Sequence, residues 1–338
     1  MSRTEITTAL LLCTALVSNA GAVCCPVFPP QWQMRSTGQT NFVNVDNGTI
    51  TLIPNVVFRG DAPDFALLVP TPTVPMLTPM SDLLWEELSA LTRPRGRTRT
   101  SWSEGCGTTD AIPLAGGIDE ATDDGIDIID RQTVGRFEAT ILRADATENL
   151  IAWLDTNGYG YSVDDAAAFT TYIDRDWVFT AMRLDPADPL NDVPTDGWDH
   201  TVDPVAFSYE AADFEVALPI TAIHREERLP MRFYVVADAR MTLEGFTTNY
   251  ANRLSADEAS VIAARNTEVP RWAKASKFLV RLDRTFSPTD PMADSIVLRR
   301  AASQDEVAPG FNGPIGSAIP LGLLPWLLVF AWSRRRRK

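Results

Sequence analysis

Two runs of alternating polar and apolar residues, 40–46 and 49–58, are separated by Asn47-Gly48. Alternation with period two is typical of a strand that buries one face. Both central residues of a type I′ turn need a positive φ, which Asn and Gly adopt at low cost. The chain therefore predicts an antiparallel β-hairpin here, and with it a fold built around a sheet.

Further strand-like segments follow in runs, with short helices inserted between them. Leucines recur at helical spacing over 82–91, and Ser255 and Glu258 form a capping box that opens a helix. Strands in runs with inserted helices favour an α+β, mainly antiparallel architecture over an alternating β/α one. The predicted strands are 64–70, 134–143, 177–184, 204–210, 214–223, 231–237, 240–247 and 277–283, and the other predicted helices are 146–153 and 162–174.

Residues 93–133 interrupt this pattern and predict a long loop or insertion. The segment begins with four arginines between 93 and 99 and ends with six acidic residues between 119 and 130. Opposite charges in one segment either neutralise each other or remain solvated.

The N-terminus has the three parts of a secretory signal peptide. Arg3 and the free amine form a basic start, an apolar run follows from Ala9 to Val17, and Ala20-Gly21-Ala22 offers small residues to a signal peptidase. Residues 1–22 are therefore predicted to be removed before Val23.

The C-terminus predicts a membrane anchor. Residues 315–332 carry no charge, which at about 1.5 Å per residue is just long enough for a hydrocarbon core. The arginines at 334–337 and Lys338 form a basic tail, residues 333–338, that the positive-inside rule keeps cytoplasmic. The predicted organisation is thus an exported region, 23–300, a polar stalk, 301–314, and a single membrane helix. This end also resembles bacterial sorting tails, so processing and transfer to an outer-surface anchor are left open.

The net charge of the chain limits the kinds of partner that it can bind. The 338 residues carry 44 acidic and 30 basic side chains, a formal net charge of −14. Removing both ends takes away six basic residues and one acidic residue, which leaves the exported region near −19. A nucleic-acid partner is therefore excluded as a general role.

Five blocks, in order, resemble one bacterial family, the domain of unknown function 2330. They are Cys24-Cys25-Pro26, the segment GDAPDFALLVPTPTVP, and residues 134–184, 229–241 and 278–298. Residues 93–133 and much of 185–228 fall outside the resemblance. It implies an exported, often membrane-tethered protein and no particular activity.

Catalytic motifs are weak. His200 and His224 are the two histidines, and neither lies beside a nucleophile motif, so both are interpreted as solvated surface residues. Trp85, Trp153 and Trp177 fall in apolar blocks and are interpreted as core. The favoured function is a non-catalytic envelope module that binds an envelope protein or a glycan. The alternative is an extracytoplasmic hydrolase that depends on carboxylates or a metal.

No cofactor is expected, with one alternative. Asp123, Asp124, Asp127 and Asp130 are weak candidates for calcium ligands, since carboxylate oxygens bind this ion outside the cell. A solvated acidic loop is the competing interpretation.

Three cysteines remain after the leader is removed: Cys24, Cys25 and Cys106. Adjacent cysteines pair with each other only with strain, so the sequence predicts one disulfide from Cys24 or Cys25 to Cys106. Three reduced, buried thiols are the alternative.

Overall fold

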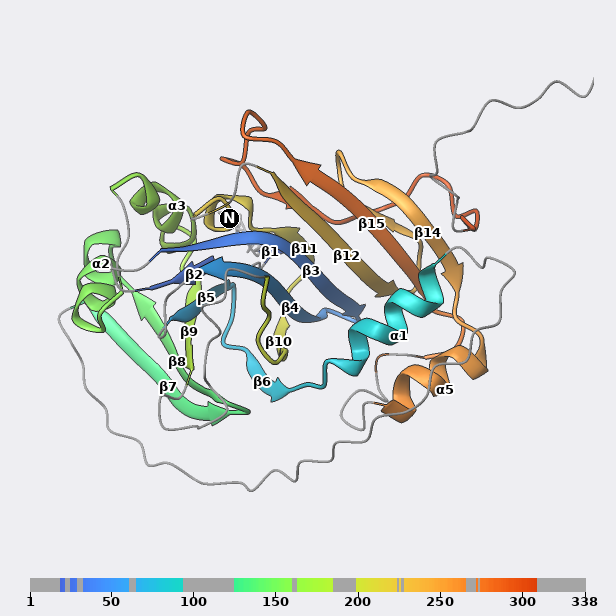
Figure 1. Ribbon diagram of the computed structural model, residues 1–338, viewed down its shortest axis with the longest axis horizontal. Coiled ribbons are helices and arrows are strands. Elements are labelled where there is room, and N and C mark those ends of the chain that lie inside the picture. The colour runs from blue at the N-terminus through green and yellow to red at the C-terminus, as the bar shows by residue number, and fades with distance from the viewer. Residues whose placement is uncertain are drawn as a thin grey trace, which may run out of the picture.

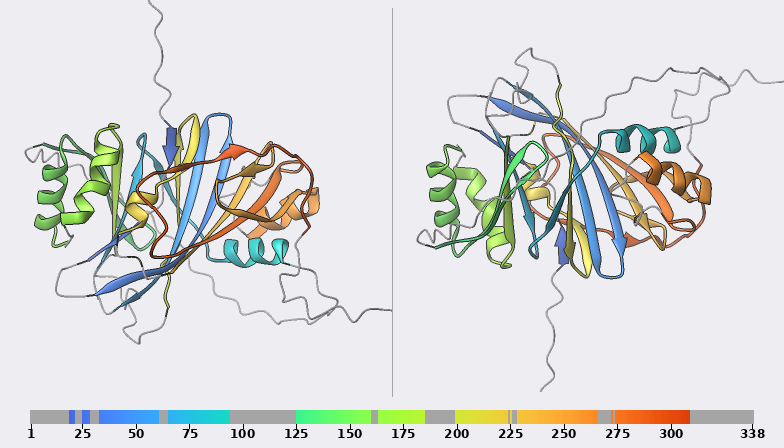
Figure 2. Two further views of the ribbon diagram at one scale, coloured as in Figure 1. Left: turned by 90° about the horizontal axis from the view of Figure 1, so that it is seen from above. Right: turned by 90° about the horizontal axis from the view of Figure 1, so that it is seen from below.

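The fold has four layers, a pair of helices, two β-sheets and a second pair of helices (Figures 1 and 2). A computed structural model describes residues 19–21, 25–28, 33–60, 65–93, 125–159, 163–184, 199–223, 225, 228–265, 272 and 274–308. The main core lies between the two sheets, and each sheet buries its outer face under one helix pair. The predicted α+β, mainly antiparallel class is confirmed at this level.

The larger sheet has seven strands and contains the predicted hairpin. Asn47 and Gly48 both have positive φ, 50° and 83°, as the turn requires. All neighbours are antiparallel except β12 and β3, which run parallel. The order is β14 (Thr247–Arg253), β15 (Phe278–Phe286), β12 (Leu229–Ala237), β3 (Met34–Asp46), β4 (Thr49–Gly60), β10 (Val205–Glu210) and β6 (Met76–Pro79).

The smaller sheet has five antiparallel strands and corrects one prediction. Residues 126–133, placed in the long loop or insertion 93–133, belong instead to its edge strand β7, which extends to Val134. This segment forms a strand because it pairs with β8, and its own sequence does not indicate that pairing. The order is β2 (Cys25–Val27), β5 (Ala66–Thr71), β9 (Val178–Leu184), β8 (Phe137–Ala144) and β7 (Ile126–Val134). The rest of the predicted loop, from residue 94 to 124, lies outside the described residues.

The helices cover the two outer faces. Helices α2 (Thr147–Thr156), α3 (Val163–Ile173) and α4 (Leu218–Thr221) pack on the five-stranded sheet. Helix α1 (Leu83–Thr92) packs on the seven-stranded sheet, and α5 (Ala256–Arg265) lies against α1. Figure 2 shows the two groups on opposite sides of the molecule. The capping box of α5 is confirmed, because Ser255 Oγ accepts the Glu258 backbone N–H at 3.2 Å while Glu258 Oε2 accepts the Ser255 N–H at 3.0 Å.

The predicted strand 214–223 is only half correct. Strand β11 (Asp213–Val216) ends before Pro219, which starts the short helix α4. A buried apolar run does not by itself distinguish a strand from a helix, and Pro is favoured in the first turn of a helix. The predicted strand 240–247 likewise divides into β13 (Met241–Thr242) and the start of β14.

Both predicted ends make contact with the domain. Strand β1 (Asn19–Gly21), inside the predicted leader, pairs in parallel with β11, whose other neighbour is β16 (Ile296–Val297). In the predicted stalk, the Ala301 N–H donates to Arg240 O and Val307 pairs with Ala251. The stalk is therefore packed on the domain as far as Val307, close to β13 and its partner β17 (Arg299–Arg300).

No helix among the described residues is long and apolar enough to cross a membrane. The predicted membrane helix, 315–332, and its basic tail lie outside these residues, as do residues 1–18 of the leader.

Candidate functional site

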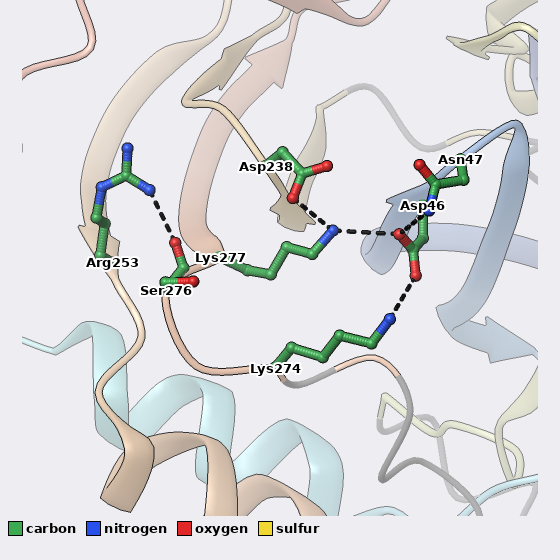
Figure 3. Close-up of polar contacts among 7 residues, drawn as sticks. All are labelled: Asp46, Asn47, Asp238, Arg253, Lys274, Ser276 and Lys277. Atoms are coloured by element: carbon green, nitrogen blue, oxygen red, sulfur yellow. Dashed lines mark hydrogen bonds and ion pairs between the residues drawn. The ribbon is translucent and has the colours of Figure 1, made fainter.

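Four charged side chains meet at the end of the seven-stranded sheet where the β3–β4 hairpin turns (Figure 3). Lys277 Nζ lies 3.2 Å from Asp46 Oδ1 and 2.7 Å from Asp238 Oδ1, and Lys274 Nζ lies 2.9 Å from Asp46 Oδ2. We call these four residues the lysine clamp. It joins three connections that are far apart in the sequence: the hairpin turn, the end of β12 and the turn before β15.

The backbone around the clamp holds the lysines in place. Ser276, between them, has a φ of 72°, in the left-handed region that tight turns use. Its carbonyl accepts a hydrogen bond from Arg253 Nη1 at 2.8 Å (Figure 3), and its N–H donates to Leu254 O at 2.9 Å. The turn is thereby tied to the end of β14, so both lysines project toward Asp46.

Lysine at this place is unusual for the chain, which has three lysines and 27 arginines. Lys274 and Lys277 are two of the three. An ammonium is a compact charge with three donors, so a single lysine nitrogen can serve two carboxylates at once. Lys277, whose side chain is 9% exposed, makes this use of its charge.

The pKa values of Asp46 and Lys277 are both shifted in the direction that favours the charged form. The hydrogen bond from Lys274 holds the pKa of Asp46 below its usual range, and Lys277 reinforces this effect while partial burial opposes it. Burial alone would lower the pKa of Lys277, but its hydrogen bonds to Asp238 and Asp46 outweigh burial, so its pKa is raised. Neither group is poised to exchange a proton near pH 7, which argues against acid–base catalysis here.

A pocket of about 260 Å³ opens beside the clamp. Its floor is one row across four strands, in which Asn44 faces Thr51, Thr51 faces Ser208 and Ser208 faces Met76. We call it the lysine-end pocket; it is lined by Asn44, Asp46, Thr49, Thr51, Met76, Ser208, Trp272 and Lys274.

The floor of this pocket holds an unsatisfied acceptor. Asn44 is 3% exposed, and its side-chain Oδ1 has no hydrogen-bond partner among the described residues. The neighbouring hydroxyls of Thr51 and Ser208 lie 3.1 Å apart and bond to each other. A buried polar atom left without a partner costs about 1–3 kcal/mol, so a ligand or water that donates to Asn44 would recover that free energy.

An aromatic wall completes the pocket. Trp272 is 5% exposed and stacks on Phe42 of β3, with ring centroids 5.9 Å apart. Met76, at the end of the floor row, is exposed. The pocket therefore combines an apolar wall, a floor of hydroxyl and amide groups and a charged rim.

The structure places the predicted disulfide residues only in part. Cys25 is buried in β2 against the helix-covered core of the five-stranded sheet. Cys24 and Cys106 lie outside the described residues, so the disulfide stays a prediction. Alkylation without prior reduction, followed by peptide mapping, tests it, because labelling of all three cysteines would rule out the bridge.

The structure likewise describes only part of the set of calcium candidates. Asp127 and Asp130 lie in β7, on either side of an irregularity in its pairing with β8, and Asp130 Oδ2 accepts a hydrogen bond from Gln132 at 2.8 Å. Asp123 and Asp124 lie outside the described residues. Across the residues that the structure does describe, no three His, Cys, Asp or Glu side chains are grouped to hold a metal. Calcium binding therefore stays a prediction.

The histidines and tryptophans are placed as follows. His200 is half-buried and its backbone pairs with Phe58 at 2.8 and 2.9 Å, while His224 lies outside the described residues. Trp153 and Trp177 are buried, as predicted for core residues, and Trp85, in α1, is partly buried and packs against the core beneath that helix.

Sequence reasoning missed the lysine clamp and the lysine-end pocket. Asp46 was interpreted only as the last residue before a turn, although it meets Lys277 across 231 positions of chain. One signal was present: two of the three lysines lie three residues apart in an arginine-rich chain.

The sequence was compared with protein families, curated proteins and solved structures. The pattern of the bacterial domain of unknown function 2330, described as an uncharacterised protein conserved in bacteria, matches residues 18–298. The chain belongs to this family. No curated protein and no solved structure matches it. The match includes strand β1 and ends at Leu298, so it spans both large sheets and the helices that cover their outer faces.

Proposed function

We propose that this member of family 2330 is an exported, membrane-held envelope protein whose folded region binds a ligand without transforming it. The ligand is a polar, uncharged group of the size of one sugar unit, carried by an envelope glycan. The lysine-end pocket is its binding site.

The observation that carries this proposal is the unsatisfied oxygen of Asn44 at the floor of the pocket. A hydroxyl group donates a hydrogen bond to such an oxygen, and the Thr51 and Ser208 hydroxyls can rotate to donate or accept. The Trp272 wall offers an apolar surface to the carbon face of a sugar ring, which is how aromatic rings and hydroxylated ligands combine in concave sites. The volume, about 260 Å³, suits one such unit.

The electrostatics favour binding over hydrolysis. A carboxylate-dependent hydrolase needs an acid whose pKa is raised and which faces the substrate. Asp46, on the pocket rim, has a lowered pKa and is held by two lysines. Burial raises the pKa of Asp82, with the charge of Asp203 adding to it, but Asp82 lines neither the lysine-end pocket nor the second pocket described below.

Export and anchoring rest on the two ends of the sequence. A chain truncated after Gly313 should be released into the soluble exported fraction, and N-terminal sequencing should find Val23 first. Continued retention of the truncated chain in membranes would contradict the anchor.

The ligand is tested by calorimetric titration of the full chain in detergent with three uncharged sugars: glucose, galactose and N-acetylglucosamine. We expect at least one sugar to bind, and Asn44→Leu to weaken that binding by about tenfold, because a hydrogen bond to a buried acceptor is lost.

The matched control is Asn55→Leu. Asn55 lies in β4 on the same face of the sheet and also has a buried oxygen without a partner, but it does not line the lysine-end pocket. Its replacement should leave sugar binding unchanged. Equal losses in both variants, or no binding of any sugar by the wild type, would contradict the proposal.

A further inference from the structure

A second polar cluster lies on the same face of the seven-stranded sheet. Asp283 in β15 faces Arg232 in β12, which faces Thr40 in β3. The residues of the lysine clamp lie six positions away along each of these three strands. An even spacing keeps side chains on one face, and at about 3.3 Å per residue the two clusters are roughly 20 Å apart.

Asp283 is shared by two arginines. Its Oδ1 accepts a hydrogen bond from Arg232 Nε at 2.6 Å, and its Oδ2 accepts bonds from Arg281 Nε and Asn249 Nδ2, each at 2.7 Å. Both arginines are held through Nε, and the Arg232 side chain also hydrogen-bonds Tyr234. A guanidinium has five N–H donors, so Arg232 keeps terminal N–H groups for a further acceptor. We call Asp283, Arg232, Arg281 and Asn249 the arginine cluster.

Backbone irregularities help to build the cluster and the space beside it. The β14–β15 register shifts at Asn249, and the β3–β4 register shifts at Thr37. A bulge turns a side chain away from the regular alternation, which here aims the Asn249 amide at Asp283. Gly38 follows the second bulge, and a Cβ there would meet the Pro230 ring at 3.3 Å.

The cluster carries a net positive charge. Burial by itself raises the pKa of Asp283, but the hydrogen bonds from Asn249 and Arg232 and the charges of Arg232 and Arg281 outweigh it, so its pKa lies below the usual range. Two guanidinium groups thus share one carboxylate in a protein whose formal charge is −14. A half-buried excess of positive charge attracts an anion.

An open pocket of about 450 Å³ lies beside Arg232 and Asp283. It also contains Asp199, whose Oδ1 accepts hydrogen bonds from Arg59 Nη2 at 2.8 Å and Thr37 Oγ1 at 3.1 Å. This second carboxylate therefore has its own cation and leaves the excess charge of the arginine cluster uncompensated. We call this space the arginine-end pocket.

We infer that the arginine-end pocket binds the oxyanion of a small molecule, a phosphate or a phosphate ester, through the terminal amino groups of Arg232. Arg281, which bonds the other oxygen of Asp283, adds positive charge. The remaining volume of the pocket accommodates the rest of an ester. This site is independent of sugar binding at the lysine end.

The test is calorimetric titration of the full chain with inorganic phosphate and with glycerol 3-phosphate at constant ionic strength. We expect one or both to bind, and Arg232→Gln to weaken that binding by about tenfold or more, as charge-assisted hydrogen bonds require. Tighter binding of glycerol 3-phosphate would identify an ester, and tighter binding of phosphate would identify the free ion; either supports the site.

Arg143→Gln is the matched control. Arg143 is 34% exposed against 36% for Arg232, and it also pairs with one aspartate through Nε, but it lies on the other sheet. Its loss should leave phosphate binding unchanged. If Arg232→Gln does not fold, Arg232→Lys keeps the charge without the planar fork and should weaken binding by a smaller factor. Equal binding by the wild type and the Arg232 variants, or none below about 10 mM, would overturn the inference.

Discussion

The lysine clamp and the arginine cluster lie at opposite ends of one face of the seven-stranded sheet. They share one arrangement of charges but differ in net charge. In each, a carboxylate on a strand is shared by two cations. At the lysine end a second carboxylate, Asp238, brings the charge to zero, and the cations come from a turn. At the arginine end one arginine lies on the same strand as Asp283 and the other on the neighbouring strand, and the net charge of the cluster is positive. The first arrangement fastens connections together, whereas the second retains capacity for an anion.

The middle of the same face shows why the ends are distinct. Between them, side chains of β3, β12 and β15 such as Phe42, Tyr234 and Leu279 are buried in a core cluster that also contains Leu84 and Leu88 of α1. This cluster thereby divides the face into two separate polar regions. A change at one end should therefore leave the other unaffected, since distant sites without shared partners act independently.

The largest expected effect is at the arginine end. Asp283→Asn leaves two guanidinium groups without their carboxylate, and we expect the free energy of unfolding to fall by about 2 kcal/mol. Phosphate should restore more stability to this variant than to the wild type, because it replaces the missing charge. Urea unfolding with phosphate, and with chloride at equal ionic strength, measures this. If phosphate stabilised the wild type and Asp283→Asn equally, the arginine end would not differ from the lysine end in its capacity for an anion.

Lys277→Met tests the lysine end. The substitution leaves Asp46 and Asp238 facing each other beside a partly buried site, and we expect a loss of about 2 kcal/mol, moderated by the exposure of Asp238. Phosphate should not restore it. Urea unfolding with and without phosphate gives the answer, and recovery in phosphate would show that both ends bind anions.

The contribution of Asp46 to the stability of the protein depends on pH. The folded-state pKa of Asp46 is lowered, so its contribution is present above the unfolded pKa of about 3.9 and is lost as the pH falls through the lower folded value. Asp46→Asn should cost about 1 kcal/mol at pH 7 and progressively less on acidification below pH 4. Unfolding midpoints between pH 7 and pH 2 measure it; a constant difference over this range would mean that the charge of Asp46 is not what stabilises the clamp.

The smallest effect is expected for Lys274→Met. Lys274 is the more exposed lysine of the clamp, and an exposed ion pair contributes about 0.5 kcal/mol. Thermal unfolding of this variant beside Lys277→Met compares the two lysines directly. A loss as large as that of Lys277→Met would show that burial does not rank them.

Local signals predicted much of the fold. The Asn47-Gly48 turn and the Ser255–Glu258 capping box are complete within a few residues, and both form as predicted. Strand β7 was missed because its apolar and polar residues do not alternate regularly, and only its pairing with β8 makes it a strand.

The candidate sites could not be predicted in the same way. Each depends on residues from separate strands, such as Arg232 and Asp283, which are 51 positions apart, and on the order of strands in the sheet. Alternation shows which face a residue occupies and says nothing of which strand lies beside it. Asn44 illustrates the limit, since its sequence context is that of any polar position in a hairpin, and only the assembled sheet leaves its oxygen unsatisfied.

Strand β1 connects the proposed removal of the leader with the pairing of β11. Residues 19–21 belong to the predicted leader and also cover one edge of β11. The cut predicted before Val23 takes this strand away, and the mature N-terminus cannot replace it, because Cys25–Val27 is already paired with β5. The proposed cut would leave the backbone of Asp213–Glu215 unpaired on this side, and an unpaired edge accepts an extended segment from another chain. In an uncut chain residues 19–21 keep that edge paired, so cleavage before Val23 would change which part of the sheet is open to pairing.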